Sequence, residues 1–109
     1  MTECNISIAR DFSRHTSPRK KDQGRNSGEK FRELLVKRLK DCDVVTVDLD
    51  GTSGIGSSFL DEAFGGLVRY EDFTANEVFR RVQIKSELDE SYLVTIKECI
   101  QRSKTLVNA

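Results

Sequence analysis

The strongest constraint on the fold is a short run of β-branched residues, Val44 to Leu49, between two segments of helical periodicity. The run is almost entirely apolar and is bounded by Asp and Gly residues. Such a run is typical of a central strand that is covered on both faces, as in a parallel sheet. A parallel sheet needs helical connections between its strands, so the flanking segments decide the fold class.

Strands and helices are expected to alternate along the whole chain. The expected elements are a strand at 5–12, a helix capped by Ser27, the strand at 44–49, a helix from Ser58, a short helical turn from Ala75, a strand containing Val82 and Ile84, and a helix at 89–103. This order predicts an α/β fold with a mainly parallel sheet, right-handed crossovers and three helices. Gly65 and Gly66 fall inside the second helix, which predicts close packing against a neighbouring element.

Length and charge limit the range of functions. The chain has 109 residues, and its 18 Lys and Arg residues balance its 18 Asp and Glu residues. One hydrophobic core and one domain are expected, without nucleic-acid binding through bulk charge. No membrane span and no signal peptide is apparent, so the cytoplasm is the expected location. Cys4, Cys42 and Cys99 are isolated from one another and from His15, which predicts reduced thiols and neither a metal site nor a cofactor.

Residues 13–26 form a segment that we call the basic loop. It contains no apolar residue from Ser13 to Arg25, and a single acidic residue, Asp22, opposes five cationic ones: Arg14, Arg19, Lys20, Lys21 and Arg25. We expect this loop to be mobile, because it buries nothing that would offset the entropy cost of ordering it. Nucleic-acid contact through Arg19, Lys20, Lys21 and Arg25 is a weaker hypothesis, because no aromatic residue is interleaved with them.

The segment that ends the central strand, "VVTVDLDGT", carries two interpretations. It matches the first motif of haloacid-dehalogenase-like, magnesium-dependent phosphatases, in which Asp48 would be the nucleophile and Asp50 the general acid and base. Such an enzyme also needs a Lys and further carboxylates from later strands, and Lys85 and the pair Asp89 and Glu90 are the only candidates. Alternatively, Asp48 and Asp50 turn the chain and bind backbone amides of the loop.

The glycine-rich loop "GTSGIGSS" lies between the central strand and the second helix. It lacks the spacing of the dinucleotide and Walker motifs, so its glycines are expected to supply positive φ angles in a tight turn. Ser58 and Asp61 fit a helix capping box. Loops that follow parallel strands converge at one edge of the sheet, which predicts a partner-binding surface there, made of Asp50, Gly51, Ser53, Gly54, Ser57, Ser58 and Asp61.

The residues "DFS", "SGEKFR" and "VDLDGTSGIGSSFLDEAFGGLVR" together resemble the STAS-like domain family of unknown function of bacteria and archaea. That family is named for its likeness to the STAS fold of anti-sigma-factor antagonists, a small α/β sheet with helices. The resemblance implies a non-catalytic regulatory module that binds a protein partner. A homo-oligomer is compatible with it.

In antagonists of that type, a partner kinase with a histidine-kinase-like ATPase fold phosphorylates a Ser at the start of the helix after the central strand. The matching positions here are Ser57 and Ser58, although the antagonist pattern Asp-Ser-x-Gly reads Gly56-Ser57-Ser58-Phe59 in this chain. A helix N-terminus favours an anion, whereas Asp61 and Glu62 in the first turn would repel a phosphate. Helix capping and a phosphorylation switch are therefore both left open for these serines.

Overall fold

The structure is a computed structural model that describes residues 2–16 and 19–108. Its centre is a three-stranded parallel sheet in the order β1 (Glu3–Ser7), β2 (Val44–Asp48) and β3 (Val82–Lys85). Ile6 of β1 lies beside Val47 of β2, which lies beside Ile84 of β3. The predicted α/β class and the parallel sheet are confirmed.

Five α-helices accompany the sheet in the described residues, instead of the three expected. They are α1 (Gly28–Asp41), α2 (Ser57–Leu60), α3 (Gly66–Tyr70), α4 (Ala75–Arg81) and α5 (Ser91–Asn108). The single helix expected from Ser58 is divided into α2 and α3 by a π-helical turn, Asp61–Gly65. The short turn expected from Ala75 is a full helix, capped by the Thr74 hydroxyl, which accepts from the Glu77 N–H.

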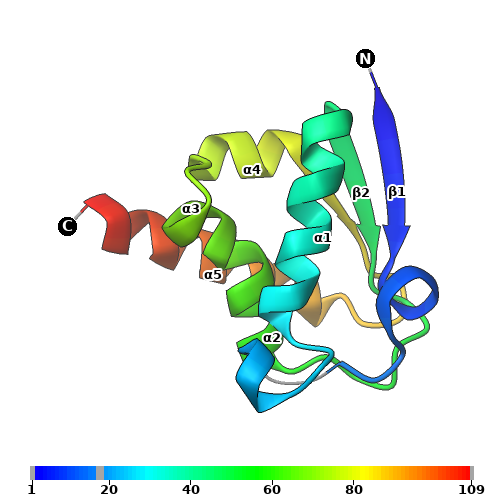
Figure 1. Ribbon diagram of the computed structural model, residues 1–109. Helices are drawn as coiled ribbons and strands as arrows, with labels where there is room; N and C mark the ends of the chain where they lie inside the picture. Colours follow the sequence, from blue (N-terminus) through cyan, green and yellow to red (C-terminus); the bar gives the residue numbers. More distant parts are fainter. Residues whose placement is uncertain (1, 17–18, 109) are drawn as a thin grey trace.

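The central strand is covered on only one face, which corrects the expectation of two. Val45 and Val47 are fully buried, whereas Val44, Thr46 and Asp48 are only half-buried. In the order β1-β2-β3 both connections move across the sheet in the same direction, and crossovers of the usual right-handed kind then lie on the same face. The helices accordingly lie to one side of β1 and β2 in Figure 1.

The first strand is also shorter than expected, because it ends at Ser7 and continues as a π-helical turn, Ile8–Phe12. The Ser7 hydroxyl accepts a hydrogen bond from the Arg10 N–H, and an Asp11 carboxylate oxygen accepts one from the Ser7 N–H. These local bonds end the strand, since polar side chains near a strand terminus compete for its backbone groups.

Aromatic rings join α1 to the helical segment 57–70. The ring of Phe31 lies 5.4 Å from Phe12, 5.9 Å from Phe59 and 6.1 Å from Phe64, measured between ring centroids. Phe31, Phe59 and Phe64 are all fully buried. Gly28, at the start of α1, allows this approach, because a Cβ there would lie 2.5 Å from the Phe59 carbonyl oxygen. The Ser27 cap of α1 is confirmed: its hydroxyl accepts from the Lys30 N–H.

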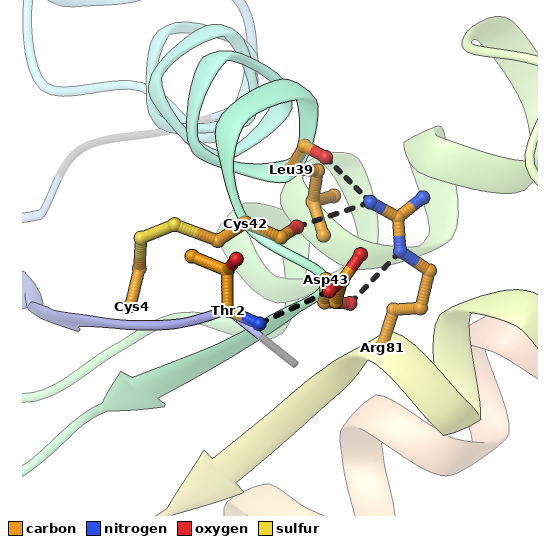
Figure 2. The surroundings of a disulfide bond; sticks show 6 residues. All are labelled: Thr2, Cys4, Leu39, Cys42, Asp43 and Arg81. Atoms are coloured by element: carbon orange, nitrogen blue, oxygen red, sulfur yellow. Dashed lines mark hydrogen bonds between the residues drawn. A yellow bond between two sulfur atoms is a disulfide. The ribbon is translucent and has the colours of Figure 1, made fainter.

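The opposite end of α1 is attached to β1 and α4 (Figure 2). Cys4 and Cys42 form a disulfide, with their Cα atoms 6.0 Å apart, so the prediction of reduced thiols is wrong for this pair. Cys42 caps α1 by donating its N–H to the Arg38 carbonyl. The Arg81 guanidinium donates to the carbonyls of Leu39, Cys42 and Asp43, satisfying acceptors that a helix end leaves free. Sequence spacing gave no sign of the pairing, which the β1–β2 register creates.

None of the helices in residues 2–16 and 19–108 is long and apolar enough to cross a membrane.

Candidate functional site

The predicted partner-binding residues lie in two separate pockets. Asp50, Gly51, Ser53 and Gly54 line the loop pocket, of about 200 Å³, together with Leu49, Thr52, Leu88, Asp89 and Tyr92. Ser57, Ser58 and Asp61 line the serine pocket, of about 330 Å³, together with Arg19, Thr95, Glu98, Cys99 and Arg102. The single predicted surface is therefore divided between the loop after β2 and the start of the helical segment 57–70.

In the loop pocket, Asp50 has a structural role. Its two carboxylate oxygens accept from the N–H groups of Leu88 and Glu87, at 3.0 and 3.1 Å, and these bonds lower the pKa of Asp50. Asp48 accepts from the Asp50 N–H at 2.9 Å and lies 3.8 Å from the ammonium nitrogen of Lys85. The interpretation that Asp48 and Asp50 turn the chain and bind loop amides is confirmed.

The glycines of this loop supply the expected backbone freedom at two positions. Gly51 has φ +91° and Gly54 has φ +127°, conformations that a side chain disfavours. The Ser53 hydroxyl donates to the Arg14 carbonyl and lies 3.1 Å from Nδ1 of His15. Residues 14–16 therefore cover part of this loop and occupy the Ser53 hydroxyl.

The capping box predicted for Ser58 and Asp61 is wrong. The helical segment begins one residue earlier, with Gly56 as the N-cap and no side-chain hydrogen bond at that cap. Asp61 is directed instead to three arginines, so its carboxylate is unavailable for capping. Ser57 and Ser58 are both exposed, and neither hydroxyl caps the helix.

Asp61 belongs to a network of ion pairs that the sequence did not predict, which we call the ion-pair cluster. It consists of Asp61 and Glu62 with the cations Arg19, Lys20, Arg32, Arg69 and Arg102. Glu62 is fully buried and binds Arg32 at 2.5 Å and Lys20 at 3.2 Å. Asp61 binds Arg19 at 2.5 Å and Arg69 at 3.1 Å, and Arg102 lies 3.4 Å away.

The cluster holds both carboxylates in their ionised form. Burial acts to raise the pKa of Asp61, but hydrogen bonds from Arg19 and Arg69 outweigh burial and lower this pKa to about 2. The pKa of Glu62 is lowered in the same way: burial opposes ionisation, and hydrogen bonds from Arg32 and Lys20 outweigh it. Both negative charges are therefore balanced by cations within the fold.

Three cations of the cluster also contact the ring of Tyr70. The charged groups of Lys20, Arg32 and Arg69 lie 5.1, 5.1 and 5.3 Å from the centroid of the Tyr70 ring, within the range of cation–π attraction. Arg32 also donates to Glu71 at 2.9 Å. Five cations thus surround Asp61, Glu62 and Glu71, whereas the serine pocket itself is lined by two cations, Arg19 and Arg102, and two carboxylates, Asp61 and Glu98.

The basic loop contributes two of these cations. Arg19 and Lys20 pair with Asp61 and Glu62, and Lys21 pairs with Glu33 at 2.5 Å. The expectation that the loop buries nothing is therefore wrong for Arg19 and Lys20, which are half-buried, while the mobility of the loop stays a prediction. Ser17 and Pro18, also in this loop, lie outside the described residues. One sequence signal could have predicted these ion pairs. Because the whole chain is neutral and the loop is basic, the rest of the chain carries a net negative charge that can attract the loop.

Cys99 completes the serine pocket as a buried free thiol, which confirms the prediction of a reduced cysteine at this position. Its sulfur lies 3.6 Å from a guanidinium nitrogen of Arg102, and burial raises the pKa of the thiol. Within the described part of the chain, no three His, Cys, Asp or Glu side chains are grouped so as to hold a metal ion.

The sequence was compared with known protein families, and one family matches it. A family model described as a STAS-like domain of unknown function matches residues 27–92, which include α1, β2, the loop pocket and the segment 57–70. The chain belongs to this family. The resemblance inferred from the sequence is thereby confirmed, and the STAS-like domain covers more than half of the chain. No curated protein and no solved structure matches the chain.

Proposed function

We propose that this STAS-like domain is a non-catalytic protein-interaction module whose partner binding is switched by phosphorylation of Ser57 or Ser58. The observation that carries the proposal is the serine pocket, which brings two exposed serines together with Arg19 and Arg102. Guanidinium groups bind phosphate through paired, charge-assisted hydrogen bonds, so such a pocket suits a phosphorylated serine.

The ion-pair cluster reduces the electrostatic objection to this switch, and the carboxylates that still oppose a phosphate in the serine pocket are Asp61 and Glu98. From the sequence, Asp61 and Glu62 were expected to repel a phosphate that carries about −1.5 to −2 charges. In the structure, Glu62 is enclosed by Arg32 and Lys20, and Asp61 is bound by arginines. An added phosphate would compete with Asp61 for Arg19 and Arg102, the two cations of the cluster that line the serine pocket.

The partner that we propose is a protein kinase with a histidine-kinase-like ATPase fold, the class that the family resemblance implies. It would bind the surface that contains both the loop pocket and the serine pocket. A phosphate on Ser57 or Ser58 would then add negative charge within the interface. Such a charge weakens an interface that is complementary to the unmodified surface.

Mass spectrometry of the protein purified from its native cells tests the switch. Phosphate is expected on Ser57 or Ser58, and the Ser57→Ala and Ser58→Ala variants identify which one carries it. Ser91, an exposed serine at the start of α5, is the matched control, because it lies outside the serine pocket. Absence of phosphate from both serines under all growth conditions, or phosphate on Ser91 alone, would contradict the proposal.

The other two hypotheses have less support. For a phosphatase, Asp50 would have to release the N–H groups of Leu88 and Glu87 to act as an acid and base. Turnover of a phosphate monoester that requires magnesium and is lost in Asp48→Asn would establish it over the interaction module. For nucleic-acid contact, Arg19, Lys20 and Lys21 would have to leave their carboxylate partners.

A further inference from the structure

The outer edge of β3 is open on the side away from β2. The Lys85 carbonyl accepts from the Leu49 N–H of the chain that follows β2. Backbone polar groups of successive residues point to opposite sides of a strand, so the N–H and carbonyl of Ile84 point away from β2. In the sheet of the described residues, β3 is a terminal strand. Such an edge is a template for pairing with another strand.

An apolar groove runs beside this edge, between α4, β3 and α5. Phe79, Val82, Ile84, Leu93 and Ile96 line it, with Lys97 as its charged member. Leu88, three residues after β3, has a side chain that is 81% exposed. An open strand edge beside an apolar groove and an exposed Leu is typical of a protein-binding surface.

The charges at the two ends of β3 favour one way of pairing two copies of this strand. Arg80 precedes β3 and is exposed, whereas three exposed acidic residues, Glu87, Asp89 and Glu90, follow it and outnumber the exposed Lys85 at its end. When two identical strands pair antiparallel about a two-fold axis, the start of each lies beside the end of the other. Arg80 then lies near the acidic residues of the second copy, while parallel pairing would bring like charges together.

We propose that a second copy of this chain pairs with it antiparallel along β3, forming a two-fold dimer with one continuous sheet of six strands. Each copy's Leu88 and groove are then removed from water, and Ile84 exchanges backbone hydrogen bonds with the other copy. This surface does not include the serine pocket, so dimerisation can be tested without phosphorylation, but it shares Leu88 with the loop pocket of the proposed kinase interface.

Sedimentation equilibrium over a range of protein concentrations tests the dimer. The wild-type chain is expected to have the mass of a dimer at about 100 μM, whereas Ile84→Pro, which removes the outward N–H, is expected to be a monomer. Arg80→Glu and Glu87→Arg should each weaken the dimer by about tenfold or more, and the double variant should restore it. Leu106→Asp, an exposed apolar residue near the end of α5, is the control and should not change the association.

Circular dichroism confirms that each variant is folded. If Ile84→Pro unfolds, the charge-reversal series, which leaves the strand intact, decides the question. A wild-type monomer at about 100 μM would overturn the proposal, since the dimer proposed here is expected to form below that concentration. A dimer whose affinity is unaffected by both single charge reversals would also overturn it, because the interface would then lie elsewhere.

Discussion

Replacing Glu62 by Ala should destabilise the fold strongly. The substitution leaves Arg32, whose side chain is only 7% exposed, without its main partner, and it removes the carboxylate that binds Lys20. Removing one partner of a buried ion pair costs about 3–5 kcal/mol, because the remaining charge is buried uncompensated. Arg32 retains the Glu62 backbone carbonyl at 2.7 Å and Glu71 at 2.9 Å, which places the loss near the lower limit, about 3 kcal/mol.

That loss is a large part of the stability of a chain of this size, which is about 5–15 kcal/mol. It corresponds to a fall in melting temperature of about 12–24 °C. Urea and thermal unfolding followed by circular dichroism measure both quantities. Glu33→Ala is the matched control: Glu33 pairs with Lys21 at 2.5 Å, yet both side chains are about half exposed. Its loss should be about 0.5 kcal/mol or less. A Glu62→Ala loss as small as that of Glu33→Ala would show that the buried pairs of Glu62 contribute no more to stability than an exposed pair.

Three further predictions concern the cluster and its supports. Because the folded-state pKa of Asp61 is about 2, below its ordinary 3.8, its ion pairs stabilise the fold fully above about pH 4. This contribution, about 2 kcal/mol, should be lost as the pH falls towards 2, and acid unfolding of Asp61→Asn should lack that component. Reducing the Cys4–Cys42 disulfide, which closes a loop of sequence separation 38, should lower the unfolding free energy by about 3–4 kcal/mol, and dithiothreitol should not affect the Cys4→Ala variant further. Gly65→Ala should cost about 1–3 kcal/mol in urea unfolding, because a Cβ there would lie 2.8 Å from the Ser103 hydroxyl oxygen.

Local sequence patterns were sufficient to predict the order of the elements. The strand ending at Asp48, the Ser27 cap and the alternation at Val82 and Ile84 depend on neighbouring residues, so periodicity and capping rules apply directly to them. The close packing predicted for Gly65 also follows from local cost, since a glycine inside a helix needs a compensating contact.

The sequence was least informative about the partners of the acidic pair. Arg32 lies 30 residues before Glu62, and Arg102 lies 41 residues after Asp61, so no local spacing links them. Helical periodicity placed Asp61 in a first turn as part of a cap, but the π-helical turn that begins at Asp61 alters the phase of the helix. The sequence pattern therefore placed Ser57 and Ser58 correctly at the start of a helix, but it did not predict the arginines that bind Asp61 beside them.

Phosphate binding in the serine pocket through Arg19 and Arg102 can be measured on the phosphate itself. The direct measurement is a ³¹P NMR pH titration of the protein with phosphoserine incorporated at position 57 and, separately, at position 58. Cationic surroundings favour the dianion, so at one of the two positions the second phosphate pKa should fall below its usual value of about 6. Replacing Arg102 by Ala should return that pKa towards 6. A pKa at or above about 6 at both positions in the otherwise wild-type protein would mean that the acidic residues dominate the pocket, and it would contradict phosphate binding by Arg19 and Arg102.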